Sequence, residues 1–206
     1  MIKLRLDDAI CELEPSGNIK IEEAINSAIS TIPPTRVITR VNVNGARYQS
    51  TEKNSILQES TKSSHDIEIL TADKAIWAAT GYDIALSSIE RVQRSVIRSA
   101  ELFREFDNLN GNRLLVQCIE GLERFIEAIT ITKRAVGLDF SKINVDGMIL
   151  SQIESNLQQI LNSVFNLQEK EDYQELADTI EYELLTNLVN WTQALTQLRT
   201  EQNSNT

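Results

Sequence analysis

The chain has 206 residues, of which 41% are hydrophobic and 24% charged, as in a folded globular protein rather than a disordered or fibrous one. A formal net charge of -10 repels phosphate backbones and anionic lipid surfaces, so neither nucleic acid nor a membrane is expected as a partner. Apolar and charged residues alternate at the N-terminus where a signal peptide would be apolar, and we therefore expect a cytoplasmic protein.

The first part of the chain predicts a hairpin followed by a short helix. Residues 2–6 and 10–14 alternate between apolar and polar side chains on either side of a turn at Asp7-Asp8. Apolar residues then recur at helical spacing over 21–32, until two prolines stop the helix.

Further strands are predicted in residues 37–72. Residues 37–43 alternate, and Asn44-Gly45 supplies a pair that accepts positive φ in a tight hairpin turn, so a strand should return from Ala46 to Gln49. Residues 66–71 predict a last strand. The polar residues 50–65 between these strands predict a mobile loop.

Two strands, a helix and then two or three strands follow one another over residues 1–72. This order resembles the β-grasp fold of ubiquitin-like and sulfur-carrier domains. Those families act through a C-terminal Gly-Gly carboxylate, whereas residues 1–72 run directly into a predicted helix and the chain ends Asn203-Ser204-Asn205-Thr206. Their conjugation chemistry is therefore not expected, and a small α+β head of another topology stays an alternative.

From residue 73 onward the apolar period becomes helical. A short segment from Asp73 to Ala79 precedes Gly81, and Asn108–Asn112 (NLNGN) is interpreted as a break between helices. Asp172 followed by Glu175 resembles a helix start. Four apolar stripes at steps of three and four run from Ala85 to Phe106, from Leu115 to Ile129, from Ile149 to Leu167 and from Tyr173 to Leu198.

These stripes predict an antiparallel, up-down bundle of about four long helices. The fold class is therefore α+β, mainly α, with a β-grasp-like head over residues 1–72 and the bundle over 73–206. A single very long helix in place of the third and fourth helices is the alternative, because residues 166–172 contain neither Gly nor Pro.

Motifs of the common enzyme classes are missing from the sequence. The one histidine, His65, has no second ligand at metal-binding spacing, so it is interpreted as an exposed loop residue. No phosphate-binding loop, nucleophile elbow or Cys-x-x-Cys motif occurs. We expect no metal and no cofactor, and we expect Cys11 and Cys118 to be buried thiols, with a disulfide as the alternative.

Two charge patterns lie on the predicted helices. Seven acidic residues and one lysine occupy residues 169–183, which favours either a solvated helix start or a docking face for a basic partner. The first long helix carries Arg91, Arg94, Arg98 and Arg104. Since the first and last helices of an up-down bundle are neighbours, Arg98 or Arg104 should approach one of the candidate binding residues Glu175, Asp178 and Glu181.

Trp77 and Tyr82 flank Gly81 at the predicted junction between head and bundle. They are interpreted either as packing residues or as the lining of a binding groove.

Two functions are predicted from the whole sequence. The first is a non-enzymatic protein-protein interaction protein, such as an adaptor, a chaperone-like binder or an assembly component, whose partner is another protein chain or a second copy in a homodimer. The second is an enzyme or small-ligand-binding protein with its site at this junction.

Overall fold

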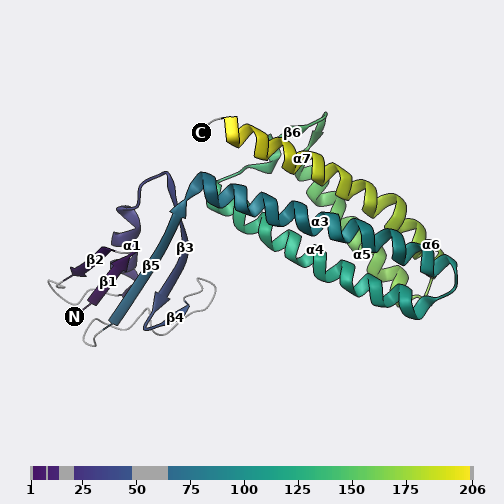
Figure 1. Ribbon diagram of the computed structural model, residues 1–206, viewed down its shortest axis with the longest axis horizontal. Helices are drawn as coiled ribbons and strands as arrows, with labels where there is room; N and C mark the ends of the chain where they lie inside the picture. Colours follow the sequence, from purple (N-terminus) through teal and green to yellow (C-terminus); the bar gives the residue numbers. More distant parts are fainter. Residues whose placement is uncertain (1, 8, 14–20, 48–64, 205–206) are drawn as a thin grey trace. The chain divides into compact units, whose positions relative to one another are not determined.

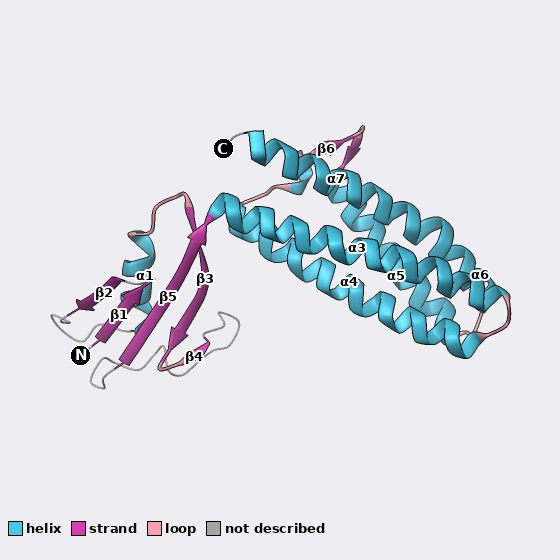
Figure 2. Cartoon of the chain, in the orientation of Figure 1, coloured by secondary structure: helices cyan, strands magenta, loops and turns pink. Residues whose placement is uncertain are grey.

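The fold of the protein is α+β and mainly α. The computed structural model describes residues 2–7, 9–13, 21–47 and 65–204 (Figure 1). The chain divides into two compact units, residues 1–77 and 78–206. Strands form the sheet of the first unit, and long helices form most of the second (Figure 2).

The first unit contains one mixed sheet of five strands in the order β2-β1-β5-β3-β4. β1 and β5 pair in parallel, and the other neighbours are antiparallel. This order is compatible with the β-grasp-like topology, which stays a prediction. The strands are β1 (Ile2–Leu6), β2 (Ala9–Leu13), β3 (Arg36–Val43), β4 (Ala46–Arg47) and β5 (His65–Asp73).

Helix α1 (Ile21–Ser30) packs its apolar face against this sheet. The two elements share one small hydrophobic core, because the helical spacing of its apolar residues and the alternation within the strands each produce one apolar face. The core comprises Leu4, Ile25, Ala28, Val43, Ile67 and Ile69. Of the predicted mobile loop over 50–65, residues 50–64 lie outside the described residues, whereas His65 begins β5.

The turn between β3 and β4 has the predicted geometry. Asn44 and Gly45 both have positive φ, at 53° and 80°. A two-residue hairpin turn of this kind matches the twist of the strands that it joins. A side chain at Gly45 would meet no atom within 4 Å, so only the backbone conformation demands glycine there.

We expect Gly45→Val to destabilise the first unit by about 1–3 kcal/mol, because a β-branched residue is strained at positive φ. Thermal unfolding followed by circular dichroism measures the loss. Gly45→Asn is the control, because asparagine tolerates this conformation much better. Equal melting curves for the valine variant and the original chain would contradict the positive φ assigned to Gly45 in this turn.

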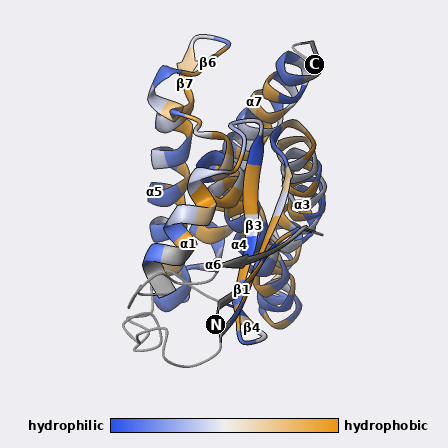
Figure 3. Ribbon diagram, turned by 90° about the vertical axis from the view of Figure 1, so that its left-hand side faces the viewer, coloured by the Kyte–Doolittle hydropathy of each residue, from blue (hydrophilic) through white to orange (hydrophobic). Residues whose placement is uncertain are grey.

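The second unit is an antiparallel bundle of long helices. Its last three helical segments, α6, η2 and α7, form one continuous helix. The middle segment, η2, is a π-helical stretch between two α-helices. Each long helix carries hydrophobic and hydrophilic residues on different sides (Figure 3). The segments are α3 (Lys74–Arg104), α4 (Asn108–Val136), α5 (Leu150–Glu169), α6 (Tyr173–Asp178), η2 (Thr179–Leu184) and α7 (Leu185–Ser204).

Side-chain contacts establish the order of the helices around the bundle. Lys133 on α4 forms an ion pair of 3.1 Å with Glu154 on α5. Asn187 on α7 donates a hydrogen bond of 3.0 Å to the carbonyl oxygen of Ile153 on α5. Arg199 near the end of α7 pairs with Asp83 near the start of α3 at 3.0 Å. Each helix therefore has two antiparallel neighbours, as the sequence predicted.

The separation of a short segment, Asp73 to Ala79, from the long helix beyond Gly81 is wrong, and Gly81 and Gly111 both lie inside helices. α3 continues from Lys74 through Gly81, where a Cβ atom would overlap Thr132 Oγ1 on α4. The interpretation of Asn108–Asn112 as a break is also wrong. α4 begins at Asn108, and a Cβ at Gly111 would lie 2.7 Å from the ring of Phe103. Both glycines allow α3 and α4 to approach each other closely.

The turn between α3 and α4 lies a few residues before the predicted break. Phe106 adopts a positive φ of 63° there. The side chain of Asp107 then caps α4 by accepting a hydrogen bond from the backbone N–H of Asn110 at 3.3 Å. A polar cap satisfies one of the free N–H groups at the start of a helix, so Asp107 rather than glycine defines this boundary.

The third and fourth helices are separate. Glu171 has a positive φ of 58°, and Asp172 accepts a hydrogen bond from the backbone N–H of Glu175 at 3.3 Å. The predicted N-cap at Asp172 is confirmed, and the alternative of one very long helix is excluded. The capping bond begins the new helix without Gly or Pro in the turn.

The connection between α4 and α5 contains structure that the sequence did not predict. A 3-10 helix, η1 (Phe140–Lys142), and a small hairpin of β6 (Asn144–Val145) and β7 (Met148–Ile149) lie there. Phe140 and Val145 are buried in the core of the bundle. The connection therefore covers one end of the bundle with apolar side chains.

Candidate functional site

Arg104 joins the first helix of the bundle to the acidic start of the last. Its guanidinium donates to Asp178 at 2.7 Å and also to Glu181, and it lies 5.8 Å from the ring centre of Tyr182. The hydrogen bonds to these two carboxylates raise the pKa of Arg104 further above its usual value. The predicted approach of Arg104 to the acidic residues is confirmed.

The other predicted charges of this region lie elsewhere. Arg98 pairs with Glu101 on its own helix at 2.7 Å, and Arg94 pairs with Glu90 at 3.0 Å. Glu175 is exposed and has no ion pair within the described part of the chain. Since the single positive charge of Arg104 offsets one of the two negative charges of Asp178 and Glu181, the acidic helix start offers less free charge than the sequence suggested.

Trp77 and Tyr82, the other candidate binding residues, belong to different units. Trp77 is partly buried and is the last residue of the first unit. Tyr82 is buried in the core of the bundle, where desolvation and the negative charge of Glu201 raise its pKa to about 12. Tyr82 therefore contributes its ring to the core, and the proposed binding role of both residues stays a prediction.

A groove lies between α4 and α5, with a volume of about 160 Å³. We call it the α4–α5 groove. Apolar side chains dominate it, and Glu154 at one end is neutralised by Lys133. Its lining comprises Phe125, Ile126, Ile129, Thr130, Glu154, Leu157, Gln158, Leu161 and Trp191.

Trp191 on α7 also lines this groove. Its side chain is almost completely buried and contacts Phe125 and Phe140 edge-on, with ring centres 5.2 and 5.9 Å away. Its indole N–H has no hydrogen-bond acceptor among the described residues. Buried donors are nearly always satisfied, so this unpaired N–H is an exception within the core of the bundle.

Exposed apolar side chains extend the groove along both helices. Ile119 lies two helical turns before Ile126 on the same side of α4, and Phe165 lies one turn after Leu161 on α5. Because α4 and α5 are antiparallel, Ile119 and Phe165 extend the groove at the same end. Phe165 is 65% exposed, which is unusual for a phenylalanine in a folded chain.

Acidic residues border this apolar row. Glu123 lies between Ile119 and Ile126 on α4, Glu127 lies one turn further along, and Glu169 follows Phe165 by one turn on α5. All three are exposed, and the ion pairs of the described residues include none of them. The rim of the α4–α5 groove therefore carries uncompensated negative charge.

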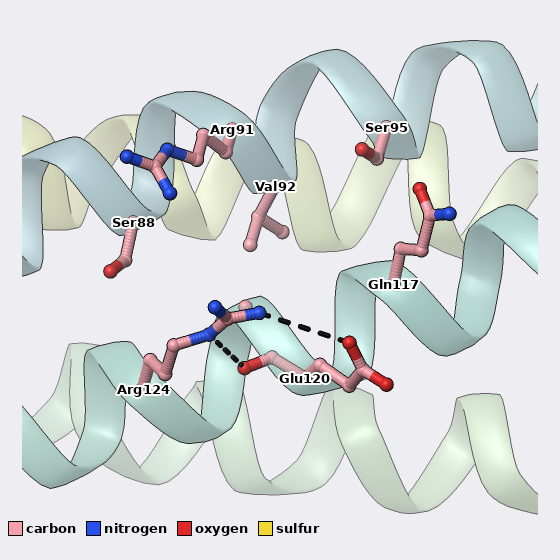
Figure 4. A pocket seen from close by; sticks show the side chains of 8 residues that line it. Ser88, Arg91, Val92, Ser95, Gln117, Glu120 and Arg124 are labelled. Atoms are coloured by element: carbon pink, nitrogen blue, oxygen red, sulfur yellow. Dashed lines mark hydrogen bonds and ion pairs between the residues drawn. The ribbon is translucent and has the colours of Figure 1, made fainter.

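A second, polar groove lies between α3 and α4, with a volume of about 400 Å³ (Figure 4). We call it the α3–α4 groove. Two guanidinium groups, two hydroxyls and an amide reach it from the facing helices, over a floor of Val92 and Gly121. Its lining comprises Ser88, Arg91, Val92, Ser95, Gln117, Glu120, Gly121 and Arg124.

Neither groove offers a site for a metal ion. No group of three or more His, Cys, Asp and Glu side chains is arranged to hold one in residues 2–7, 9–13, 21–47 and 65–204. Burial raises the pKa of the Cys118 thiol to about 12, so this cysteine stays protonated and inert near neutral pH. In the same ranges, no helix is both long and apolar enough to cross a bilayer.

Neither groove was predicted from the sequence. The sequence did contain a signal for the α4–α5 groove. The apolar residues Ile119, Ile126 and Phe165 lie outside the apolar stripes that form the core faces of their helices. In the α3–α4 groove the signal was a repeated spacing. Ser88, Arg91 and Ser95 on α3 have the same i, i+3, i+7 spacing as Gln117, Glu120 and Arg124 on α4.

A family model described as a domain of unknown function (DUF8042) matches residues 85–194, which include all the residues that line both grooves. No curated protein and no solved structure matches the chain.

Proposed function

The chain belongs to the DUF8042 family, and we propose that it is a non-enzymatic protein-protein interaction protein whose α4–α5 groove receives an amphipathic helix of a partner chain. Adaptors, chaperone-like binders and assembly components act in this way. An amphipathic helix places apolar side chains at i, i+3, i+4 and i+7 into a hydrophobic groove. The exposed row of Ile119, Ile126 and Phe165 beside the groove is the observation that carries the proposal.

The charge of the rim favours a partner helix with basic flanks. Residues 78–206 contain 19 acidic and 11 basic side chains, and Glu123, Glu127 and Glu169 border the apolar row without ion pairs. Two copies of this face would bring like charges together, which opposes a homodimer through the groove. Lysine and arginine flanks would instead attract the partner and fix its register.

Two designed peptides test the proposal. Each is an amphipathic helix of about 18 residues, long enough to be partly helical alone, with the same leucine stripe and no tryptophan. One carries lysines beside the stripe and the other carries glutamates. In the full chain with Trp77→Phe, the fluorescence of Trp191 reports on binding. We expect the lysine peptide to bind with an affinity that falls as salt is added, and the glutamate peptide not to bind.

A matched pair of variants locates the binding surface. Ile126 and Ile131 lie on the same helix and are equally exposed, at 42%, but only Ile126 lines the groove. We expect Ile126→Glu to weaken the lysine peptide about tenfold or more, because a charge then lies where an apolar side chain docks. Ile131→Glu should leave the affinity nearly unchanged.

Two results would contradict the proposal. Equal losses in both variants would place the peptide on another surface. Concentration-dependent dimers in sedimentation experiments, abolished by Ile126→Glu, would make a second copy of the chain the occupant of the groove.

A further inference from the structure

We propose that the α3–α4 groove binds a small phosphate-bearing molecule between Arg91 and Arg124. The site is separate from the α4–α5 groove, so the two proposals stand or fall independently. In Figure 4, Arg124 rises from α4 into the groove, and the side chain of Arg91 extends along α3 towards Ser88 at the opposite edge.

Arg91 differs from the neighbouring exposed arginines of α3 in its ion pairing. The neighbouring exposed arginines of α3 are neutralised within their helix, Arg94 by Glu90 and Arg98 by Glu101. Arg91 is exposed and has no ion-pair partner in the described ranges. Its guanidinium therefore reaches the groove with all its hydrogen-bond donors available.

The contacts of Arg124 orient its side chain but leave N–H groups of its guanidinium available to a ligand. Its Nε donates to the backbone carbonyl oxygen of Glu120 at 3.1 Å, and its guanidinium lies 3.8 Å from the Glu120 carboxylate. The first contact orients the side chain, whereas the second is long for a charged hydrogen bond. Arg124 can therefore turn its outer N–H groups towards a stronger anion.

The floor of the α3–α4 groove explains why the polar residues of α3 and those of α4 can contact the same ligand. A Cβ atom at Gly121 would lie 2.5 Å from Cγ2 of Val92, so the helices approach each other closely here and only glycine fits. This close approach brings the polar rows of α3 and α4 to the two edges of a single groove. Val92 is buried below and keeps the floor apolar.

The mixture of donors favours phosphate over a monocarboxylate. A guanidinium binds two oxygens at once, and two guanidinium groups together can occupy more oxygens than one carboxylate has. Ser88, Ser95 and Gln117 add neutral donors and acceptors along the remaining length. A volume of about 400 Å³ exceeds the needs of a single phosphate, so an organic phosphate with a polar body fits best.

Calorimetric titration of the full chain with inorganic pyrophosphate and with acetate, a monocarboxylate, tests the inference. We expect pyrophosphate to bind and acetate to bind at least about tenfold more weakly. Arg91→Gln and Arg124→Gln should each weaken pyrophosphate about tenfold or more, since each removes a charged hydrogen-bond donor.

Two further variants separate a specific site from general attraction. Arg94→Gln removes the same charge from the same exposed helix and should change the affinity less than about twofold, because Arg94 is paired with Glu90 and lies outside the groove. Glu120→Gln should strengthen binding, because it removes the carboxylate that competes for Arg124. Equal losses in Arg91→Gln and Arg94→Gln, equal binding of acetate, or no binding of pyrophosphate would each overturn the inference.

Discussion

Replacing Leu184 by alanine should lower the free energy of unfolding of the bundle by about 2–5 kcal/mol. Leu184 is 1% exposed and belongs to the main core of the bundle. Alanine would remove three carbon atoms and leave a cavity, and the neighbouring helices can close such a cavity only in part. Denaturant unfolding followed by circular dichroism measures the difference.

The adjacent residue provides the control. Glu183 is exposed, and no ion pair of the described residues includes it. Glu183→Ala should change the stability by less than about 0.5 kcal/mol. Similar effects of the two substitutions would mean that the π-helical stretch η2 presents a different face to the core.

The second large effect is expected at Gly81. In an ordinary exposed helix, replacing glycine by alanine stabilises by about 1 kcal/mol, because alanine loses less backbone entropy. At Gly81 the new Cβ would overlap Thr132 Oγ1 and push α3 away from α4. We therefore expect Gly81→Ala to destabilise the bundle, by about 1–3 kcal/mol in thermal or denaturant unfolding.

Thr132→Ala tests whether this contact is the cause. Thr132 is buried, and its hydroxyl donates to the carbonyl oxygen of Ala128 at 2.7 Å. Removing that hydroxyl makes room for the new methyl group, so the double variant should be more stable than the sum of the two single changes indicates. A stabilising Gly81→Ala would show that the two helices do not meet closely at this position.

The sequence predicted the elements of the candidate sites better than the sites themselves. Helical spacing of apolar residues placed the four long helices, and antiparallel order alone was enough to bring Arg104 towards Asp178 and Glu181. Neither groove followed from spacing, because a groove depends on how far apart two helices lie. That distance is determined by side chains such as Val92 and Thr132 on the facing helix.

The sequence by itself therefore determined the class of the fold, the turn at Asn44-Gly45 and the cap at Asp172. Each depends on interactions within a few neighbouring residues: alternation, positive φ, or a side chain bound to a nearby backbone N–H. Only the tertiary structure decided the roles of Gly81 and Gly111. Glycine looks the same in a sequence whether it ends a helix or lets two helices touch, and only the atoms of the opposite helix distinguish the two cases.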